Sequence, residues 1–143
     1  MSSSDPGFQS AVEEAKAGLR QGGIPIGACL INASGIILGQ GRNQRVQRGS
    51  AILHAEIAAL DDAGRLPSKT YEGATMYTTL SPCDMCVGAC LLYGIGRVVV
   101  GENKNFVGGE ELLKNRGVEV VVLQDGECIE LMKGFIRDKA ELW

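Results

Sequence analysis

Apolar residues follow two different spacings along this chain, and each spacing predicts a kind of element. Over residues 8–20, and again after Asp125, they recur every third or fourth position between charged residues, which is typical of amphipathic helices. Short continuous apolar runs, such as 97–101 and 118–123, are typical of buried strands. The elements expected in chain order are a helix at 8–20, strands at 25–32 and 36–38, a helix at 54–62, a strand at 74–80, a helix at 83–93, a strand at 97–101, a helix at 110–115, a strand at 118–123 and a last helix that Asp125 caps.

Turn residues separate these elements. Gly22-Gly23 ends the first helix, and the turn signal at 32–35 joins two strands into a hairpin. Residues 39–50 are expected to form an irregular loop, and residues 64–73 a polar connection. No repeat or linker is visible, and strands alternate with helices after the opening hairpin. This order predicts one α/β domain over residues 1–143, with a mixed sheet in a three-layer α/β/α arrangement.

Composition and charge narrow the class of partner. The sequence has 143 residues, of which 45% are hydrophobic and 22% charged, and its formal net charge is −3. A nucleic-acid surface normally carries a basic patch, so this balance argues against nucleic acid and favours a small-molecule substrate. Three arginines, Arg42, Arg45 and Arg48, lie close together in the predicted loop. In an acidic chain we expect them to form a solvated face.

The cysteines and the N-terminal segment bear on the compartment. Residues 1–4 lack the basic region and the apolar core of a signal peptide. No apolar run approaches the roughly 20 residues of a membrane span. We therefore expect a cytoplasmic protein without membrane contact, in which Cys29, Cys90 and Cys128 are free thiols in apolar surroundings.

Two short motifs carry the candidate chemistry. His-x-Glu begins at His54, and Pro-Cys-x-x-Cys begins at Pro82. Zinc binds imidazole nitrogen and thiolate sulfur, and catalytic zinc sites use three protein ligands and leave one position for water. We expect His54, Cys83 and Cys86 to be those ligands. On a helix Glu56 is turned by roughly 200° from His54, so it is predicted to move protons beside the open position instead of binding metal. The two motifs in this order are the signature of zinc deaminases.

Other interpretations of these residues remain open at this point. Cys-x-x-Cys alone also occurs as a thioredoxin-like redox motif. A closed structural zinc site is a second alternative, with Cys90 as fourth ligand one helical turn beyond Cys86. His54 is the only histidine, and a lone histidine is commonly an ordinary polar residue. Glu56 discriminates between these interpretations, because a redox motif or a structural site gains nothing from a carboxylate beside it.

These residues resemble the zinc-dependent cytidine-deaminase superfamily, most closely its fungal-type cytosine deaminases. The resemblance covers nearly the whole chain and is carried by segments 22–27, 77–86 and 99–106, together with the His54–Glu56 motif. It implies a five-stranded mixed sheet between helices, one Zn²⁺ per subunit and a homodimer. It also implies hydrolysis of cytosine to uracil and ammonia in pyrimidine salvage. The superfamily further contains guanine, nucleoside and tRNA-adenosine deaminases, which share the metal motif.

The resemblance also implies roles for residues around the substrate. The Asn43 amide and the Ala55 backbone N–H would hold the N1/O2 edge of the base, and the Ser81 carbonyl would face its amine. The apolar walls of this site would be Ile26, Leu80, Phe106 and Trp143. Glu56 would take the water's proton, protonate the ring nitrogen and later help the amine leave as ammonia.

Two features of this sequence differ from the fungal enzymes. Those enzymes continue past the tryptophan with a short acidic tail that closes over the substrate, whereas this sequence ends at Trp143. Trp143 is therefore expected to be the residue that closes over the substrate in this sequence. Ala55 replaces the glycine that is common between the histidine and the glutamate in fungal enzymes, as it does in the wider superfamily.

Overall fold

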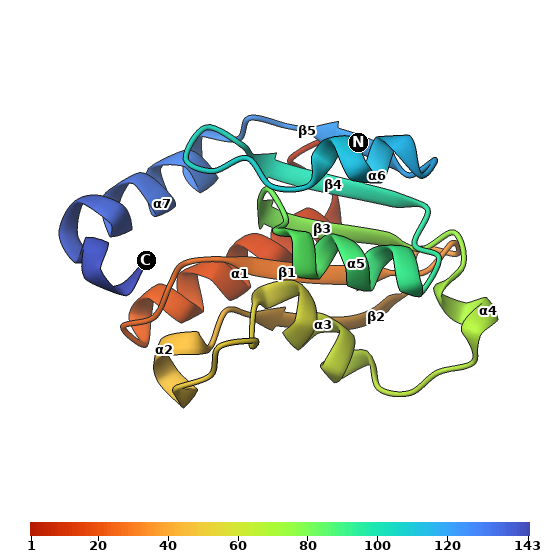
Figure 1. The fold of residues 1–143 in the computed structure, drawn as a ribbon, viewed down its shortest axis with the longest axis horizontal. Helices are drawn as coiled ribbons and strands as arrows, with labels where there is room; N and C mark the ends of the chain where they lie inside the picture. The colour runs from red at the N-terminus through yellow and green to blue at the C-terminus, as the bar shows by residue number, and fades with distance from the viewer.

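A five-stranded mixed sheet runs through the centre of the computed structural model, which describes residues 1–143 (Figure 1). The sheet order is β2-β1-β3-β4-β5; β1 is antiparallel to both of its neighbours, and β3, β4 and β5 are parallel. The predicted mixed sheet is thereby confirmed. The strands are β1 (Gly27–Ile31), β2 (Ile37–Arg42), β3 (Thr75–Leu80), β4 (Arg97–Glu102) and β5 (Glu119–Val122).

Helices cover both faces of this sheet, as the three-layer prediction requires. The helices are α1 (Pro6–Arg20), α2 (Arg45–Arg48), α3 (Ala55–Ala63), α4 (Ser68–Tyr71), α5 (Asp84–Leu92), α6 (Glu110–Asn115), α7 (Gly126–Lys139) and the 3-10 turn η1 (Ala140–Leu142). In Figure 1, α3, α5 and α6 lie on the near face and α1 lies on the far face. None of these helices combines the length and the hydropathy that crossing a bilayer requires.

Alternation along the strands divides the buried residues into two clusters. Cys29, Tyr77 and Val99 pack with the apolar face of α1 on one side of the sheet. Their neighbours in the same strands, such as Met76 and Val98, pack with α3 and α5 on the other side. The period of two in a strand produces this division, because successive side chains point to opposite faces. Both faces are apolar, so the strands appear in the sequence as continuous hydrophobic runs.

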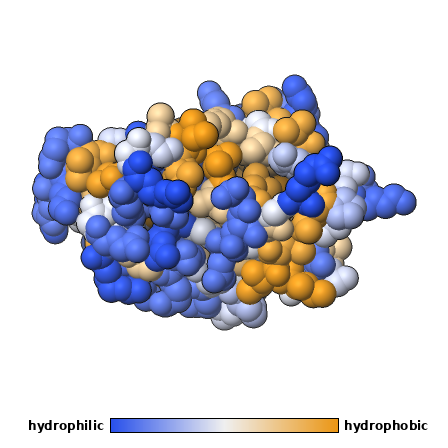
Figure 2. All heavy atoms as spheres, turned by 90° about the horizontal axis from the view of Figure 1, so that it is seen from below, coloured by the Kyte–Doolittle hydropathy of each residue, from blue (hydrophilic) through white to orange (hydrophobic).

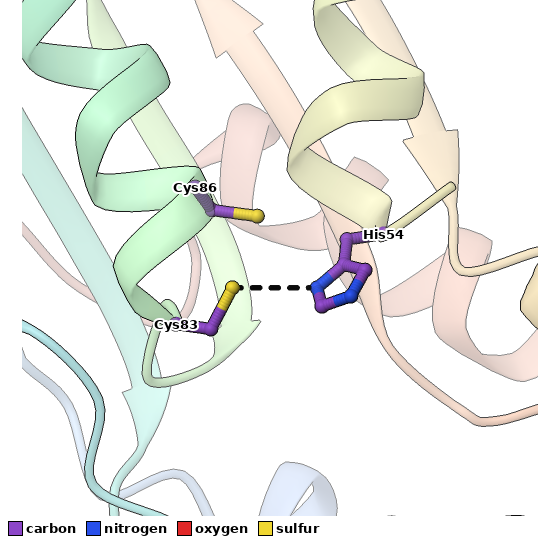
Figure 3. Close-up of side chains that lie close together, drawn as sticks. All are labelled: His54, Cys83 and Cys86. Carbon is purple, nitrogen blue, oxygen red and sulfur yellow. Dashed lines mark hydrogen bonds between the residues drawn. The ribbon is translucent and has the colours of Figure 1, made fainter. Parts of the chain in front are cut away.

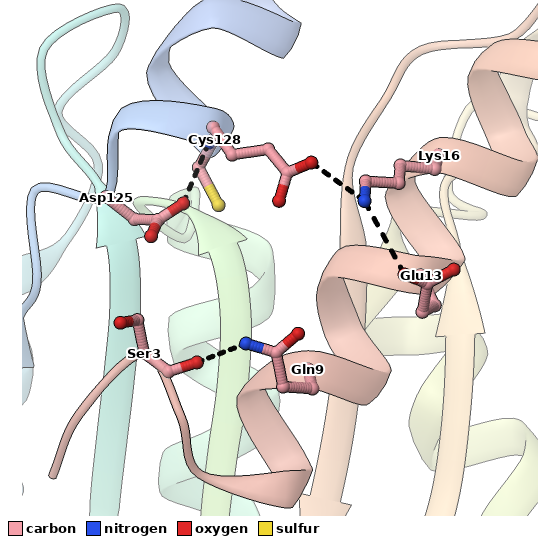
Figure 4. A network of polar contacts seen from close by, with 7 residues as sticks. Ser3, Gln9, Glu13, Lys16, Asp125 and Cys128 are labelled. Atoms are coloured by element: carbon pink, nitrogen blue, oxygen red, sulfur yellow. Dashed lines mark hydrogen bonds and ion pairs between the residues drawn. The ribbon is translucent and has the colours of Figure 1, made fainter.

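Polar contacts fix the start of α7 against α1 (Figure 4). The Asp125 carboxylate accepts a hydrogen bond from the Cys128 backbone N–H at 3.0 Å, which makes Asp125 the N-cap that the sequence predicted. Lys16 Nζ of α1 lies 2.7 Å from a Glu127 carboxylate oxygen. This ion pair is solvent-exposed, so it contributes orientation more than stability.

The structure differs from the sequence prediction in three places. Strand β2 continues to Arg42 through Gly39 and Gly41, which the prediction had assigned to a loop. A Cβ at Gly41 would lie 2.6 Å from the Ala58 Cβ, so the glycines let α3 pack closely on the strand. The two remaining differences are the one-turn helices α2 and α4, which lie within segments predicted to be irregular.

The sheet topology brings distant segments to one edge. Because β1 is antiparallel to β2 and β3, its N-terminal end lies beside the C-terminal ends of β2, β3 and β4. The residues at this edge are Ile26 before β1, Asn43 after β2, Ser81 after β3 and Phe106 after β4. Ligands of open α/β sheets commonly bind outside the carboxyl ends of the strands, so this edge is where a site is expected.

Candidate metal centre and active site

His54, Cys83 and Cys86 form a cluster at this edge of the sheet. Their ligand atoms all lie within 4.8 Å of one another, and His54 Nδ1 lies 3.5 Å from Cys83 Sγ. Figure 3 shows the imidazole at the start of α3 facing both sulfur atoms at the start of α5. His54 and Cys83 are the N-cap residues of these helices, whereas the sequence predicted them to be the first helical residues. Their extended backbones turn both side chains toward the space between the two helices.

The geometry of this cluster fits zinc. Zn–N and Zn–S bonds of about 2.0 and 2.3 Å in a tetrahedron place the ligand atoms roughly 3.5 Å apart, which matches the separation between His54 and Cys83. Burial lowers the pKa of His54, and the nearby Arg45 adds to this effect; both favour the neutral imidazole that ligation requires. Cys90 is buried but does not belong to the cluster, so the predicted alternative of a closed four-ligand site is not formed.

The environment of Cys86 disfavours a free thiolate. Burial raises its pKa above the ordinary value, and the neighbouring Glu56 and Cys83 side chains raise it further. A thiolate at this position therefore requires a compensating positive charge. A bound divalent cation supplies that charge and deprotonates a coordinating thiol outright.

Glu56 lies in the first turn of α3, two residues after His54. Its side chain is buried, and burial raises the pKa of the carboxyl to about 7, against the opposing effect of its backbone hydrogen bond and of Cys86 and Thr78. A carboxyl group with a pKa near 7 can both take up and release a proton at neutral pH. Glu56 therefore has the location and the proton affinity of an acid–base residue.

Glu56, His54 and Cys83 line a pocket of about 210 Å³. This volume is below the roughly 300–1,000 Å³ of pockets that hold drug-sized ligands. The remaining lining residues come from all the strand ends gathered at this edge and from the C-terminal residue: Ile26, Asn43, Arg45, Leu80, Ser81, Phe106 and Trp143. The structure therefore brings together nine of the eleven residues that the sequence indicated for the site.

The other two predicted site residues lie immediately beside the pocket. Cys86 belongs to the metal cluster and is completely buried. Ala55 is the first residue of α3 and is also completely buried, so its side chain contributes to the core. Only its backbone N–H, which the resemblance implicated, is relevant to a ligand.

Two aromatic rings form one wall of the pocket. The ring centroids of Phe106 and Trp143 lie 6.1 Å apart, and the ring planes are inclined by 83°, an edge-to-face arrangement. Trp143 retains 39% of its surface exposed, so the indole separates the pocket from solvent without being part of the core. The wall thus joins the loop after β4 to the end of the chain.

Arg45 was predicted to lie on a solvated face, and for this residue the prediction was wrong. Arg45 is the first residue of helix α2 and lines the pocket, where its Nε is buried without a hydrogen-bond partner. Its backbone N–H donates to Asn43 Oδ1 at 3.0 Å, which fixes the orientation of the Asn43 amide. Of the other two arginines, Arg42 forms an ion pair with Glu14 at 3.7 Å, whereas Arg48 is exposed as predicted.

The comparisons with known proteins agree with this geometry. A model of the cytidine and deoxycytidylate deaminase zinc-binding region matches residues 1–102. This chain belongs to that deaminase family. Zinc is accordingly the metal for the His54, Cys83 and Cys86 cluster, and the chain is an enzyme of the class that hydrolyses an amidine C–N bond.

Several relatives of this deaminase are named for an activity. A protein of Candida albicans named cytosine deaminase is 58% identical over 137 residues, which are 96% of this chain and 91% of that protein. A tRNA-specific adenosine deaminase of Bacillus subtilis is 36% identical over 142 residues, covering 92% of this chain and 87% of that protein.

Solved structures confirm the fold. The guanine deaminase of Nitrosomonas europaea superposes with a TM-score of 0.73 at 23% identity, covering 94% of this chain and 85% of that chain. A tRNA:A34 deaminase structure gives a TM-score of 0.71 at 26% identity, covering 87% of this chain and 97% of that chain. The predicted cytidine-deaminase-like fold is thereby confirmed.

Proposed function

We propose that this protein hydrolyses cytosine to uracil and ammonia, a reaction of pyrimidine salvage. The observation that carries the proposal is the buried carboxyl of Glu56 in the same small pocket as the zinc cluster. The relative of Candida albicans, which bears the name cytosine deaminase, supports the choice of base. A pocket of about 210 Å³ suits a single free base better than a base attached to a ribose or an RNA.

Different residues of the pocket have different roles in this reaction. His54, Cys83 and Cys86 would hold the zinc, which when bound would supply a Lewis acid that lowers the pKa of a water to about 7. Glu56 takes one proton of the attacking water and transfers it to N3 of the ring; it then takes the second proton from the new hydroxyl at C4 and gives it to the departing amine. Addition of hydroxide at C4 and loss of ammonia leave the carbonyl of uracil.

Neighbouring groups orient the base in this proposal. Because Asn43 Oδ1 is held by the Arg45 backbone N–H, its Nδ2 group is free to donate to the O2 carbonyl of cytosine. The Ser81 carbonyl accepts from the exocyclic amine. Phe106 and Trp143 exclude water from the pocket, which strengthens these hydrogen bonds because the local dielectric constant falls.

An ammonia-release screen of the zinc-loaded protein tests the proposal. The substrates are cytosine, 5-methylcytosine, guanine, adenine, cytidine, creatinine and an RNA stem-loop with an adenosine in its loop. We expect cytosine to give the highest kcat/KM. A higher kcat/KM with guanine, cytidine or the RNA would overturn the choice of substrate, and activity on none of them would overturn the deaminase proposal.

We further propose that the protein is a homodimer formed by the exposed faces of α3 and α5. A groove between these helices and the connection to α4 has a volume of about 1020 Å³, and its lining includes Ile57, Leu92 and Tyr93. Leu92 is 76% exposed, which is unusual for an apolar side chain. Asp61 and Arg65 also line the groove, and in a two-fold arrangement these opposite charges can pair across the axis.

The view in Figure 2 agrees with an interface at this side of the molecule. Apolar atoms gather on the half of this face that lies toward α4, whereas hydrophilic atoms cover most of the half toward α2. Leu92→Glu is expected to convert the protein to a monomer in light-scattering measurements of molar mass. Ile36→Glu is the matched control, since Ile36 is 60% exposed but lies in the hairpin turn, outside the groove. A monomeric wild type would refute the dimer.

The cysteines support a cytoplasmic location for this enzyme. All five are free, and the three outside the metal cluster are buried. Disulfides are rare in the reducing cytosol, so this pattern is the one expected there. The proposed small-molecule substrate needs no nucleic-acid or membrane surface.

A further inference from the structure

A buried carboxylate outside the pocket is hydrogen-bonded to one of the pocket residues. Glu110 is the first residue of α6, is only 6% exposed and forms no ion pair. Its Oε2 accepts a hydrogen bond from Ser81 Oγ at 2.5 Å, and its Oε1 accepts one from Asn103 Nδ2 at 3.2 Å. Gln124 Nε2 in turn donates to Asn103 Oδ1 at 2.6 Å. A chain of hydrogen bonds thus runs from the exposed Gln124 to the pocket.

The Ser81 hydroxyl connects Glu110 to the loop that carries Phe106. While its hydrogen is donated to Glu110, its oxygen accepts the Gly108 backbone N–H at 2.9 Å. Ser81 itself is buried and lines the pocket. This hydroxyl therefore bonds the loop to the end of β3 and to Glu110 at the same time.

Residues 103–109 are anchored at both ends. At the first end the buried carboxylate of Glu102 accepts the backbone N–H groups of Lys104 and Asn105 at 2.6 and 3.0 Å. At the second end the Gly109 N–H donates to the Pro82 carbonyl at 2.9 Å, beside the bond from Gly108 to Ser81. Phe106 lies between the two anchors, so its position in the pocket wall depends on both.

We propose that Glu110 is a positioning residue for substrate binding, which rests on the proposed function. The Ser81 oxygen accepts from Gly108 while its hydrogen is donated to the buried Glu110 carboxylate, and this donation fixes the orientation of the hydroxyl. A buried donor that is left without an acceptor is unfavourable, because it has lost its hydrogen bonds to water. Glu110 therefore holds the second anchor closed and keeps Phe106 against the base, without touching the base itself.

Amide hydrogen exchange measured by NMR tests the anchor without any substrate. Glu110→Ala is expected to increase the exchange rate of the Gly108 amide by about tenfold or more, because its acceptor is no longer held. The Asn105 amide, which Glu102 holds, should exchange as in wild type. Unchanged exchange at Gly108 would overturn the proposal.

The conservative variant separates the acceptor role from negative charge. Glu110→Gln keeps one oxygen for the Ser81 hydroxyl, and its amide can donate to Asn103 once the Asn103 and Gln124 amides rotate. We expect the Glu110→Gln variant to retain the slow exchange of the Gly108 amide hydrogen. Glu111→Ala is the matched control on the same helical turn, since Glu111 is exposed and pairs only with Lys114. Loss of protection in the Gln variant, or in the Glu111 control, would contradict the mechanism.

Kinetics test the link to the base. Glu110→Ala should raise KM for cytosine about tenfold and change kcat by less than about threefold, with zinc content unchanged. Ser81→Ala removes the other partner of the bond, so the double variant should be no worse than either single variant. Faster exchange at Gly108 with an unchanged KM would show that the anchor is structural only. A wild type inactive on every base defeats the proposed function, while the exchange measurement still decides whether Glu110 holds the loop.

Discussion

Replacing Trp143 with alanine tests whether the indole closes the active site. The indole forms one wall of the pocket and packs edge-to-face on Phe106, with ring centroids 6.1 Å apart. It retains 39% of its surface exposed, and only Phe106 pairs with it among the aromatic residues. Its removal should therefore open the pocket to water while the core remains intact.

The expected magnitude follows from this geometry. An aromatic pair in an edge-to-face arrangement contributes about 0.5–1.5 kcal/mol beyond its buried area. If its loss leaves the wall open in the free enzyme, closing the wall on the substrate costs this energy, which corresponds to a factor of about 2–12 in kcat/KM. The variant also loses the exclusion of water from a pocket of about 210 Å³, so we expect the upper end of this range. We predict a decrease of roughly tenfold in kcat/KM for cytosine, or about 1.4 kcal/mol of transition-state binding.

Steady-state kinetics on Trp143→Ala, Phe106→Ala and the double variant measure this effect. Zinc content and Tm are recorded for each variant. If the rings act as one wall, the two effects should be non-additive by about 0.5–1.5 kcal/mol. Leu142→Ala is the control, because Leu142 precedes the indole and does not line the pocket. A kcat/KM within twofold of wild type for Trp143→Ala would refute the reasoning and leave closure to the Phe106 loop alone.

Three further outcomes are expected. Purified protein should contain about one zinc per chain, and Cys83→Ser or Cys86→Ser should lose both zinc and activity, whereas Cys90→Ser should retain zinc by elemental analysis. Glu56→Gln should keep zinc and fold but lower kcat by at least about 10², and a variant within a few-fold of wild type would assign the proton transfers to another group. Removing zinc with a chelator should lower Tm by about 5–10 °C if zinc at 100 times its Kd stabilises the fold by about 2.7 kcal/mol, and an unchanged Tm would exclude such stabilisation.

The sheet and the long helices could be predicted because their patterns are unambiguous. Apolar residues spaced three to four positions apart over residues 8–20 predicted α1. Continuous apolar runs predicted the parallel strands, because both faces of these strands are buried. Strand β2 was predicted too short, because glycine normally weakens a strand. Its glycines are required because α3 packs closely on the strand. This packing is a tertiary contact, so the strand propensities of the individual residues do not reveal it.

The site was predictable to different degrees for different residues. The zinc ligands have a characteristic spacing, and few other structures explain a histidine and two cysteines in that order. Asn43, Phe106 and Trp143 carry no such signal, since each is also an ordinary turn, loop or terminal residue. They were expected at the site only because of the family resemblance. The structure places them around the same pocket as Glu56.

Arg45 and Glu110 were missed because charge on an amphipathic or irregular segment is normally solvated. Arg45 reaches the pocket only because α2 adds one helical turn after β2. Glu110 is buried only because the loop after β4 returns to Ser81, 29 residues earlier in the chain. Both cases need the sheet order before they can be recognised. The parallel pairing of β3 with β4 places the two loops side by side, and a carboxylate at the start of α6 then becomes the nearest acceptor for the Ser81 hydroxyl. The chemistry of the metal site is thus visible in local spacing, while the groups that hold its substrate are determined by which strand ends the fold brings together.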